Sequence, residues 1–334
     1  MDSHKLRWWG WGALDEAYSF EDCPDVWSAV QTWLDLPDAA LAGEKRPVPL
    51  EQISLPPTRL DDPVLASLRK LLGEENVHID KRTRLMHTYG KSYCDLIRLR
   101  AGYVPSPPDA VVYPAAQCKV AAVLTWAAER DIAIVPFGGG SSDMGGIGPH
   151  ADDRLVITLD LSKMGRVLSV DSLSCTARIQ AGATGPGLES QLNDRGFTLG
   201  HFPQSFEFST LGGWIATRSS GRNVIGYGDI ACITQAVRAV TPAGVFEIQD
   251  TPVKTAGPNL LPVLIGSEGI YGVITEATMC LRPLPEVRDY RGLLFRSFED
   301  GIAVYRALVQ DGALAPTAIW LSDGPETEAY FAAT

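Results

Sequence analysis

Apolar and polar positions along the middle of this chain follow two periods, which predict a mixed fold of strands and helices. Short apolar runs typical of buried strands occupy residues 110–113, 132–136, 154–161, 166–171 and 175–181. Apolar side chains recur at helical spacing in residues 117–130 and 185–195. The pattern therefore predicts a β-α-β unit, followed by further strands and a second helix.

The flanking regions carry weaker signals. Residues 26–36 and 63–73 have helical spacing, and Asp62 is positioned to cap the second helix. Residues 241–244 form a turn signal between two strand-like runs, which predicts a hairpin from residues 236–248. After Pro283-Leu284-Pro285 the pattern restarts, with a predicted strand at 292–295 and a helix at 301–308, so we expect a domain boundary there.

A glycine-rich segment, residues 136–146, follows the predicted strand 132–136 and is called the glycine loop below. Its three consecutive glycines destabilise the local chain by roughly 0.5–1 kcal/mol each relative to alanine, which suggests a close approach or a positive φ. Exposed N–H groups in such a loop form a concavity suited to phosphate. The usual dinucleotide fingerprint opens a helix, whereas a strand follows here. The order therefore argues for a different way of holding a dinucleotide.

Four further segments are rich in glycine, serine and threonine: residues 181–185, 200–214, 216–221 and 266–276. Each alone is more typical of a structural turn than of a ligand loop. Five such segments in one predicted domain favour an elongated ligand, which needs small residues at several strand ends.

Charge and composition narrow the function further. The net charge of −11 argues against a nucleic-acid surface, and it means that backbone N–H groups would hold most of a bound diphosphate. Six dispersed cysteines predict a reduced intracellular protein with buried thiols, and five histidines without ligand spacing predict no metal site. With no apolar run of membrane-spanning length and no signal peptide, we expect a cytoplasmic protein.

Read in order, these segments resemble a known family. Pro-Phe-Gly-Gly-Gly-Ser-Ser, Gln-Ser-Phe-Glu-Phe-Ser-Thr, Thr-Arg-Ser-Ser-Gly and Glu-Gly-Ile-Tyr-Gly-Val-Ile-Thr-Glu resemble the FAD-contacting segments of vanillyl-alcohol-oxidase-type flavoproteins. More narrowly, the chain resembles the alkyldihydroxyacetonephosphate synthase family of ether-lipid synthesis. That subgroup shares the tryptophan-rich segment 7–12, the Tyr-Gly-Lys-Ser-Tyr segment 89–93, residues 200–203 and residues 281–286.

The resemblance implies an α+β fold with an FAD-binding domain of the PCMH type, built from two α/β subdomains. We expect an N-terminal arm and helical region at 1–103, the FAD-binding domain at 104–284, and the start of a truncated α/β substrate or cap domain at 285–334. The tryptophans of residues 7–12 are interpreted as an arm that docks on the main body.

The resemblance also implies which residues contact the cofactor, noncovalently bound FAD. The glycine loop would lie over the pyrophosphate, two segments would line the isoalloxazine and ribityl side, and the last would cover the adenine half or the flavin edge. The candidates are Pro136, Phe137, Gly138, Gly139, Gly140, Ser141, Ser142, Gln204, Ser205, Phe206, Glu207, Phe208, Ser209, Thr210, Thr217, Arg218, Ser219, Ser220, Glu268, Gly269, Ile270, Tyr271, Gly272, Val273 and Ile274.

Two of these expectations concern single side chains. We favour a flavin or phosphate role for Arg218 over a surface salt bridge, because small residues surround it. His201 is equally compatible with a packed and a functional histidine. The glycine loop contains no His or Cys, the residues that often attach flavin in this superfamily, so noncovalent FAD is expected.

The sequence departs from the family pattern in two ways. The catalytic tyrosine, the substrate-phosphate arginine and a histidine-rich segment of the family would lie beyond Thr334, so no catalytic residue is assigned. Trp320 stands where the family carries an arginine important for activity, and an indole cannot replace a guanidinium. We therefore expect either a piece of a longer protein or a truncated product that has lost catalysis.

Three functions remain open from the sequence. The leading one is an FAD-dependent alkylglycerone-phosphate synthase-like protein, which exchanges the acyl group of acyl-dihydroxyacetone phosphate for a fatty alcohol. The alternatives are an FAD-dependent 2-hydroxy-acid oxidoreductase and a noncatalytic FAD-binding remnant. The expected partner is a small-molecule or lipid substrate, with no nucleic acid, and with peripheral membrane contact and a homodimer left open.

Overall fold

The computed structural model describes residues 6–16, 25–37, 47–148, 153–251, 257–312 and 316–332. The chain divides into two compact units. One comprises Val48–Glu286, and the other combines Met1–Pro47 with Val287–Thr334. The domain boundaries expected after residues 103 and 284 stay predictions.

A four-stranded sheet carries the glycine loop. Its strands are β1 (Val77–His78), β2 (Ala110–Val112), β4 (Val156–Asp160) and β3 (Ala133–Phe137), in that spatial order. Both β2 and β3 run parallel to β4, and helix α6 (Gln117–Ala128) connects them, so the predicted β-α-β unit is present. Every residue of β4 is buried, as expected of a central parallel strand. The sheet thus fixes the end of β3, where the glycine loop begins.

A second sheet is antiparallel and five-stranded. Its order is β5 (Val167–Asp171), β6 (Thr176–Gln180), β10 (Val273–Cys280), β8 (Thr234–Thr241) and β9 (Gly244–Glu247). The predicted hairpin is the β8–β9 pair, in which Thr241 lies opposite Gly244. A separate short pair joins β7 (Phe197–Thr198) to β11 (Arg282–Pro283). Two distinct sheets in one unit agree with the expected pair of subdomains.

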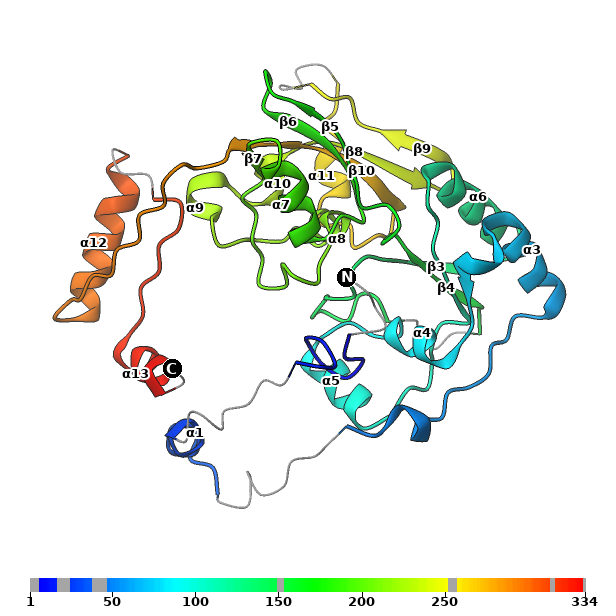
Figure 1. Cartoon of the computed structure of the whole chain (residues 1–334), viewed down its shortest axis with the longest axis horizontal. Coiled ribbons are helices and arrows are strands. Elements are labelled where there is room, and N and C mark those ends of the chain that lie inside the picture. Colours follow the sequence, from blue (N-terminus) through cyan, green and yellow to red (C-terminus); the bar gives the residue numbers. More distant parts are fainter. Residues whose placement is uncertain are drawn as a thin grey trace. The chain divides into compact units, whose positions relative to one another are not determined.

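Helices flank the sheets of this unit (Figure 1). The described ones are η2 (Leu50–Gln52), α3 (Asp62–Leu72), η3 (Glu74–Asn76), α4 (Lys81–Met86), α5 (Tyr93–Arg100), α7 (Gly185–Asn193), α8 (Leu211–Ala216), α9 (Val224–Tyr227), α10 (Ile230–Ile233) and α11 (Leu261–Leu264). The sequence predicted Asp62 as the N-cap of α3, but the N-cap is the preceding residue, Asp61. Asp61 accepts the N–H of Val64 at 2.9 Å, and Asp62 is already the first helical residue.

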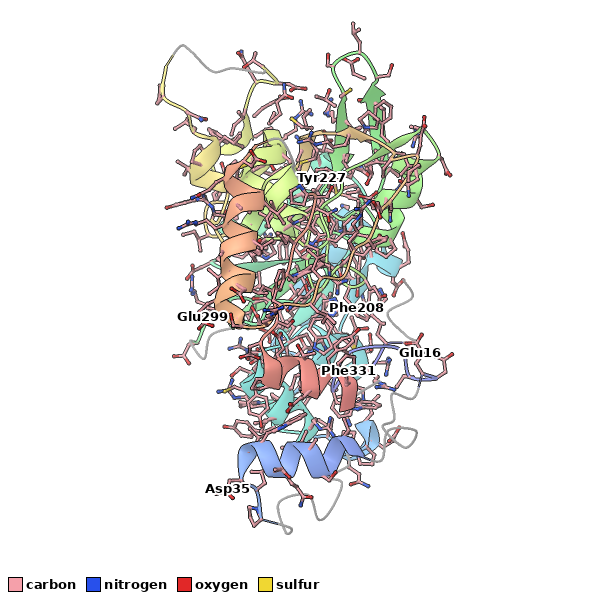
Figure 2. The ribbon with its side chains drawn as sticks, turned by 90° about the vertical axis from the view of Figure 1, so that its left-hand side faces the viewer. Glu16, Asp35, Phe208, Tyr227, Glu299 and Phe331 are labelled. Atoms are coloured by element: carbon pink, nitrogen blue, oxygen red, sulfur yellow. The ribbon has the colours of Figure 1, made fainter. Side chains whose placement is uncertain are left out.

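The second unit is described by itself. Near the N-terminus, the N–H of Arg7 donates to the carbonyl of Gly12, and this turn buries Trp8 against Trp9 at a ring distance of 5.1 Å. Helix α1 (Asp25–Leu34) packs against α13 (Gly324–Ala332). Helix α12 (Phe298–Gln310) begins at the Ser297 cap, next to Glu299, which Figure 2 labels. Docking of the tryptophan segment on the main body stays a prediction.

The strand predicted at 292–295 is wrong. These residues have no regular secondary structure, and Leu294 is fully exposed. An apolar run becomes a strand only when a neighbouring strand accepts its backbone hydrogen bonds. No strand within the described ranges pairs with this run, so its apolar side chains do not make it one.

The expectation of buried thiols is also wrong. Cys94 and Cys118 lie in the first turns of α5 and α6, and both are exposed, as are Cys232 and Cys280. Spacing alone did not show that these positions lie on solvent-facing sides of their elements. Cys23 lies outside the described residues. In the part of the chain that the structure describes, no helix is long and apolar enough to cross a membrane, and no three ligating side chains cluster.

Candidate cofactor site

The glycine loop is pressed against the segment 208–210 of the same unit. A Cβ added to Gly139 would lie 1.7 Å from the carbonyl oxygen of Phe208, and one added to Gly138 would lie 2.1 Å from Oγ1 of Thr210. Gly140 has a φ of +63°, and its missing side chain leaves room for the ring of Phe137. The close approach inferred from the glycine run is therefore present, and its partner is the chain itself.

The same packing leaves the backbone donors of the glycine loop unused. Within the described ranges, none of the N–H groups of residues 138–142 donates to a protein acceptor. Gly139 is exposed to solvent in spite of its contact with residue 208. Consecutive unpaired N–H groups at the end of a strand form a binding site for anions. The residues present thus fit a diphosphate held by the main chain.

The turn between β6 and α7 joins the site through main-chain hydrogen bonds. The N–H of Gly185 donates to the carbonyl of Ser209 at 3.2 Å, and the N–H of Leu211 donates to the carbonyl of Ala183 at 2.9 Å. Thr210 caps the short helix α8 through its Oγ1, which faces the N–H of Gly213. Two segments predicted from the sequence to act together, 181–185 and 204–210, are therefore neighbours.

Residues 266–269 connect the segment after α8 to the glycine loop. Gly266 and Glu268 donate their N–H groups to the carbonyls of Ile215 and Ala216 at 2.9 and 2.8 Å. A Cβ added to Gly269 would lie 3.2 Å from Pro136, at the start of the glycine loop. Arg218 and Glu268 both have a φ of +52°, a strained backbone region for residues with side chains. The four segments therefore meet around one end of the two sheets.

Glu268 places a carboxylate on the rim of the glycine loop. A Cβ added to Gly146 would lie 3.1 Å from its Oε2. Partial burial raises the pKa of Glu268 above its usual range, and the nearby charge of Asp143 adds to the shift. The negative charges of Glu268 and Asp143 make this rim of the loop unfavourable for a bound anion.

His201 is a packed, buried side chain in the structure. Its exposure is 3%, its Nε2 lies 2.8 Å from Oγ of Ser219, and its ring contacts Trp214 at 5.2 Å. Burial lowers the pKa of His201 to about 4, and Asp229 opposes the shift. His201 therefore fixes Ser219, one of the predicted contact residues.

The remaining predicted residues differ in their exposure. Gln204, Glu207, Thr217, Arg218, Ser220, Ile270 and Tyr271 are exposed around the meeting point of the segments. Val273 and Ile274 are buried in β10, where their side chains serve the core of the antiparallel sheet. Phe206 lies nearly parallel to Trp214 at 6.3 Å. Figure 2 labels Phe208, whose carbonyl limits the space at Gly139.

Sequence reasoning missed a buried pair behind the glycine loop. Nε2 of His87 lies 2.9 Å from Oδ2 of Asp160, the last residue of β4, and Nδ1 lies 2.7 Å from the carbonyl of Thr83. The ring of His87 also packs at 4.4 Å on Phe137, which precedes the first glycine. His87 lies between the predicted helix 63–73 and the predicted strand 110–113, where the sequence gave no periodic signal that could have identified it.

A second missed segment, residues 88–98, borders the far end of the glycine loop. The N–H of Lys91 donates to the carbonyl of Ser142 at 2.6 Å, and a Cβ added to Gly148 would lie 3.7 Å from the carbonyl oxygen of Thr88. The motif 89–93 was noted in the sequence for its resemblance, and its Gly-Lys pair before the helix cap Ser92 was the available signal.

Comparisons with known proteins identify the class. A family described as "FAD binding domain" matches residues 108–248, a range that contains the glycine loop and the segments 181–221. The chain therefore contains an FAD-binding domain. This class was expected from the sequence, and FAD is confirmed as the cofactor of the matched family.

Individual relatives narrow the class. The chain is 39% identical over 282 residues to the alkyldihydroxyacetonephosphate synthase of Trypanosoma brucei brucei and 38% identical over 283 residues to that of Dictyostelium discoideum. These alignments cover 84% and 85% of the chain and 46% of each relative. A solved alkyldihydroxyacetonephosphate synthase structure matches 99% of the chain and 64% of its own length, with 34% identity and a TM-score of 0.90.

In sequence and in fold, the chain is homologous to the alkyldihydroxyacetonephosphate synthase family, as the motifs of the glycine loop and its neighbours indicated. It spans about half the length of the curated relatives that it matches.

Proposed function

We propose that this chain binds FAD noncovalently and forms the flavin-binding part of an alkyldihydroxyacetonephosphate synthase-like enzyme of ether-lipid synthesis. The observation that carries the proposal is the row of unused N–H donors at residues 138–142, at the meeting point of the four other predicted segments. In an acidic chain, such donors bind a diphosphate without a broad positive field.

Different residues of the chain then bind different parts of the cofactor. Residues 138–142 hold the diphosphate, while the exposed hydroxyls of Thr217 and Ser220 face solvent and can reach ribityl and phosphate oxygens. His201 and Trp214 keep the segment that carries Ser219 in place. When bound, FAD supplies the reactive flavin at which the family exchanges an acyl group for a fatty alcohol.

Noncovalent attachment is favoured because the two histidines near the site, His87 and His201, are both buried and hydrogen-bonded. His201 is buried, its Nε2 is engaged with Ser219, and its lowered pKa reflects a closed, apolar environment. The glycine loop itself contains neither Cys nor His. A lipid substrate, peripheral membrane contact, a homodimer and a cytoplasmic location all belong to this proposal and stay predictions.

The first experiment uses the purified protein and its visible spectrum. Bound FAD gives flavin bands in the near-ultraviolet and the blue, and acid precipitation should release the yellow colour into the supernatant. Flavin that stays with the precipitate would contradict noncovalent binding. A folded, colourless protein that takes up no added FAD would contradict the proposed function.

A second experiment separates the candidate reactions. The FAD-loaded protein is incubated with acyl-dihydroxyacetone phosphate and a fatty alcohol, and in parallel with lactate or glycolate and a dye acceptor. We expect alkyl exchange in the first mixture. Dye reduction by the hydroxy acids would favour the oxidoreductase, and bound flavin without either reaction would favour the noncatalytic remnant.

A further inference from the structure

The 88–98 segment is a second wall of the proposed cofactor site. The close contact of Gly90 with the glycine loop depends on the absence of a side chain, since an added Cβ would lie 2.1 Å from the carbonyl oxygen of Ser142. The next residue, Lys91, donates its N–H to the same carbonyl. A Cβ added to Gly148 would lie 3.7 Å from the ring of Tyr89.

Lys91 brings a cation to this wall without a protein partner for its charge. The side chain is half-buried, and within the described ranges its ammonium makes no hydrogen bond or ion pair. Burial lowers the pKa of Lys91 to about 8, and the charge of Asp95 raises it part of the way back. An ammonium held in this state gains stability from any anion that binds beside it.

Asp95, whose charge acts on Lys91, has one carboxylate oxygen without a hydrogen-bond partner among the described residues. Its carboxylate is 3% exposed, and Oδ1 is paired with Arg98 at 3.3 Å. Its Oδ2 is buried without a hydrogen-bond partner in the described part of the chain, and it lies 3.6 Å from the Cβ position of Gly90. Buried carboxylate oxygens are normally paired, so this oxygen is poised for a donor that the free chain lacks.

We propose that the ammonium of Lys91 contacts the diphosphate of the bound dinucleotide from the 88–98 segment, opposite the N–H donors of residues 138–142. This inference rests on the proposed function. In a chain with a net negative charge, Lys91 would provide a local positive charge beside the diphosphate. The carboxylate of Glu268 approaches the loop at Gly146, whereas the N–H of Lys91 contacts the loop at Ser142. The ammonium of Lys91 is therefore the group in this segment that can pair with an anion.

The charged groups around Lys91 define how binding depends on pH. Asp95 and Arg98 come from α5, Asp143 and Glu268 from the loops, and Tyr89 precedes Lys91. Burial raises the pKa of Tyr89, so this phenol stays neutral at pH 8 to 9. Lys91 is then the group in this cluster that loses its charge there. Affinity for FAD should fall by up to tenfold per pH unit above pH 8, because only the ammonium binds an anion.

The test compares the apoprotein of the wild type with Lys91→Gln and Lys91→Arg by titration calorimetry with FAD. At pH 7 we expect Lys91→Gln to weaken binding by about 10- to 100-fold, the range for a hydrogen bond to a charged group. Lys91→Arg should retain most of the affinity and lose the dependence on pH. Wild type should take up about half a proton per FAD at pH 8, and neither variant should. Lys70→Gln, an exposed position on α3, is the matched control.

Two smaller probes locate the contact. ADP carries a diphosphate without flavin, and riboflavin carries flavin without phosphate. We expect Lys91→Gln to weaken ADP binding and to leave riboflavin binding unchanged, and the reverse would overturn the diphosphate contact. Equal FAD affinity in wild type and in a folded Lys91→Gln variant would refute the role of Lys91 while leaving the proposed function intact. Failure of the wild type itself to bind FAD would refute both.

Discussion

The segments around the glycine loop and residues 287–332 use the same kinds of side chain in opposite ways. Around the loop, positions are set by main-chain contacts, and the neighbouring strand β10 buries its residues from Val273 to Met279. In residues 287–332, α12 buries only Gly301 among its described residues, and Leu294, Tyr290 and Phe331 are largely exposed. Apolar side chains are therefore buried beside the loop and largely exposed in residues 287–332.

This contrast teaches where substitutions should matter. Where backbones approach within van der Waals distance, even one added methyl group has no space, because protein interiors are close-packed. Where side chains face solvent, most substitutions change the free energy of unfolding by less than about 0.5 kcal/mol. Matched changes in the two regions test the contrast directly.

The largest effect is expected for Gly139→Val. Its Cβ would lie 1.7 Å from the carbonyl oxygen of Phe208, so the loop must move away from residues 208–210. We expect loss of FAD retention, measured as the ratio of visible to ultraviolet absorbance after purification. Gly292→Val is the control, because nothing lies within 4 Å of the Cβ position at Gly292. Stoichiometric FAD with an unchanged spectrum in Gly139→Val would contradict the site.

A smaller effect is expected for Asp109→Ala, which lies in the same unit as the loop. Asp109 is 1% exposed and accepts hydrogen bonds from the main chain and guanidinium of Arg59 and from the N–H of Val156. Its removal leaves the N–H groups of Arg59 and Val156 without this acceptor and should lower the free energy of unfolding by about 1–3 kcal/mol in urea titrations. Asp289→Ala removes an exposed pair with Arg291 and should cost less than about 1 kcal/mol. An equal loss of unfolding free energy in the two variants would show that the burial of a carboxylate does not determine its contribution to stability here.

The smallest effect is expected for Trp320→Arg. Trp320 is 70% exposed, so exchanging its indole for a guanidinium displaces little packing. The free energy of unfolding should change by less than about 0.5 kcal/mol, and the FAD dissociation constant should be unchanged. Urea unfolding and calorimetry measure the two quantities. A loss of FAD affinity in this variant would assign the residue a role that its exposure does not indicate.

Sequence patterns predicted the elements that depend on local periodicity and on turn chemistry. The glycine run between β3 and β4 predicted a close approach, and the turn at residues 241–244 predicted the β8–β9 hairpin, because both signals are local. The run at 292–295 failed because a strand needs a partner that no local pattern supplies. Lys91 and the His87–Asp160 pair were missed for a related reason. Their importance comes from residues about 50 to 70 positions away along the chain, at Ser142 and Asp160.

The unpaired N–H groups of residues 138–142 also make the stability of the folded chain depend on the concentration of FAD. Without ligand they must be hydrated, so occupancy by FAD adds a stabilisation that grows with the logarithm of free FAD above its dissociation constant. At a hundredfold excess this amounts to about 2.7 kcal/mol, a large share of the stability of an ordinary domain. Riboflavin scarcity would then reduce the amount of folded protein as well as the fraction that is loaded.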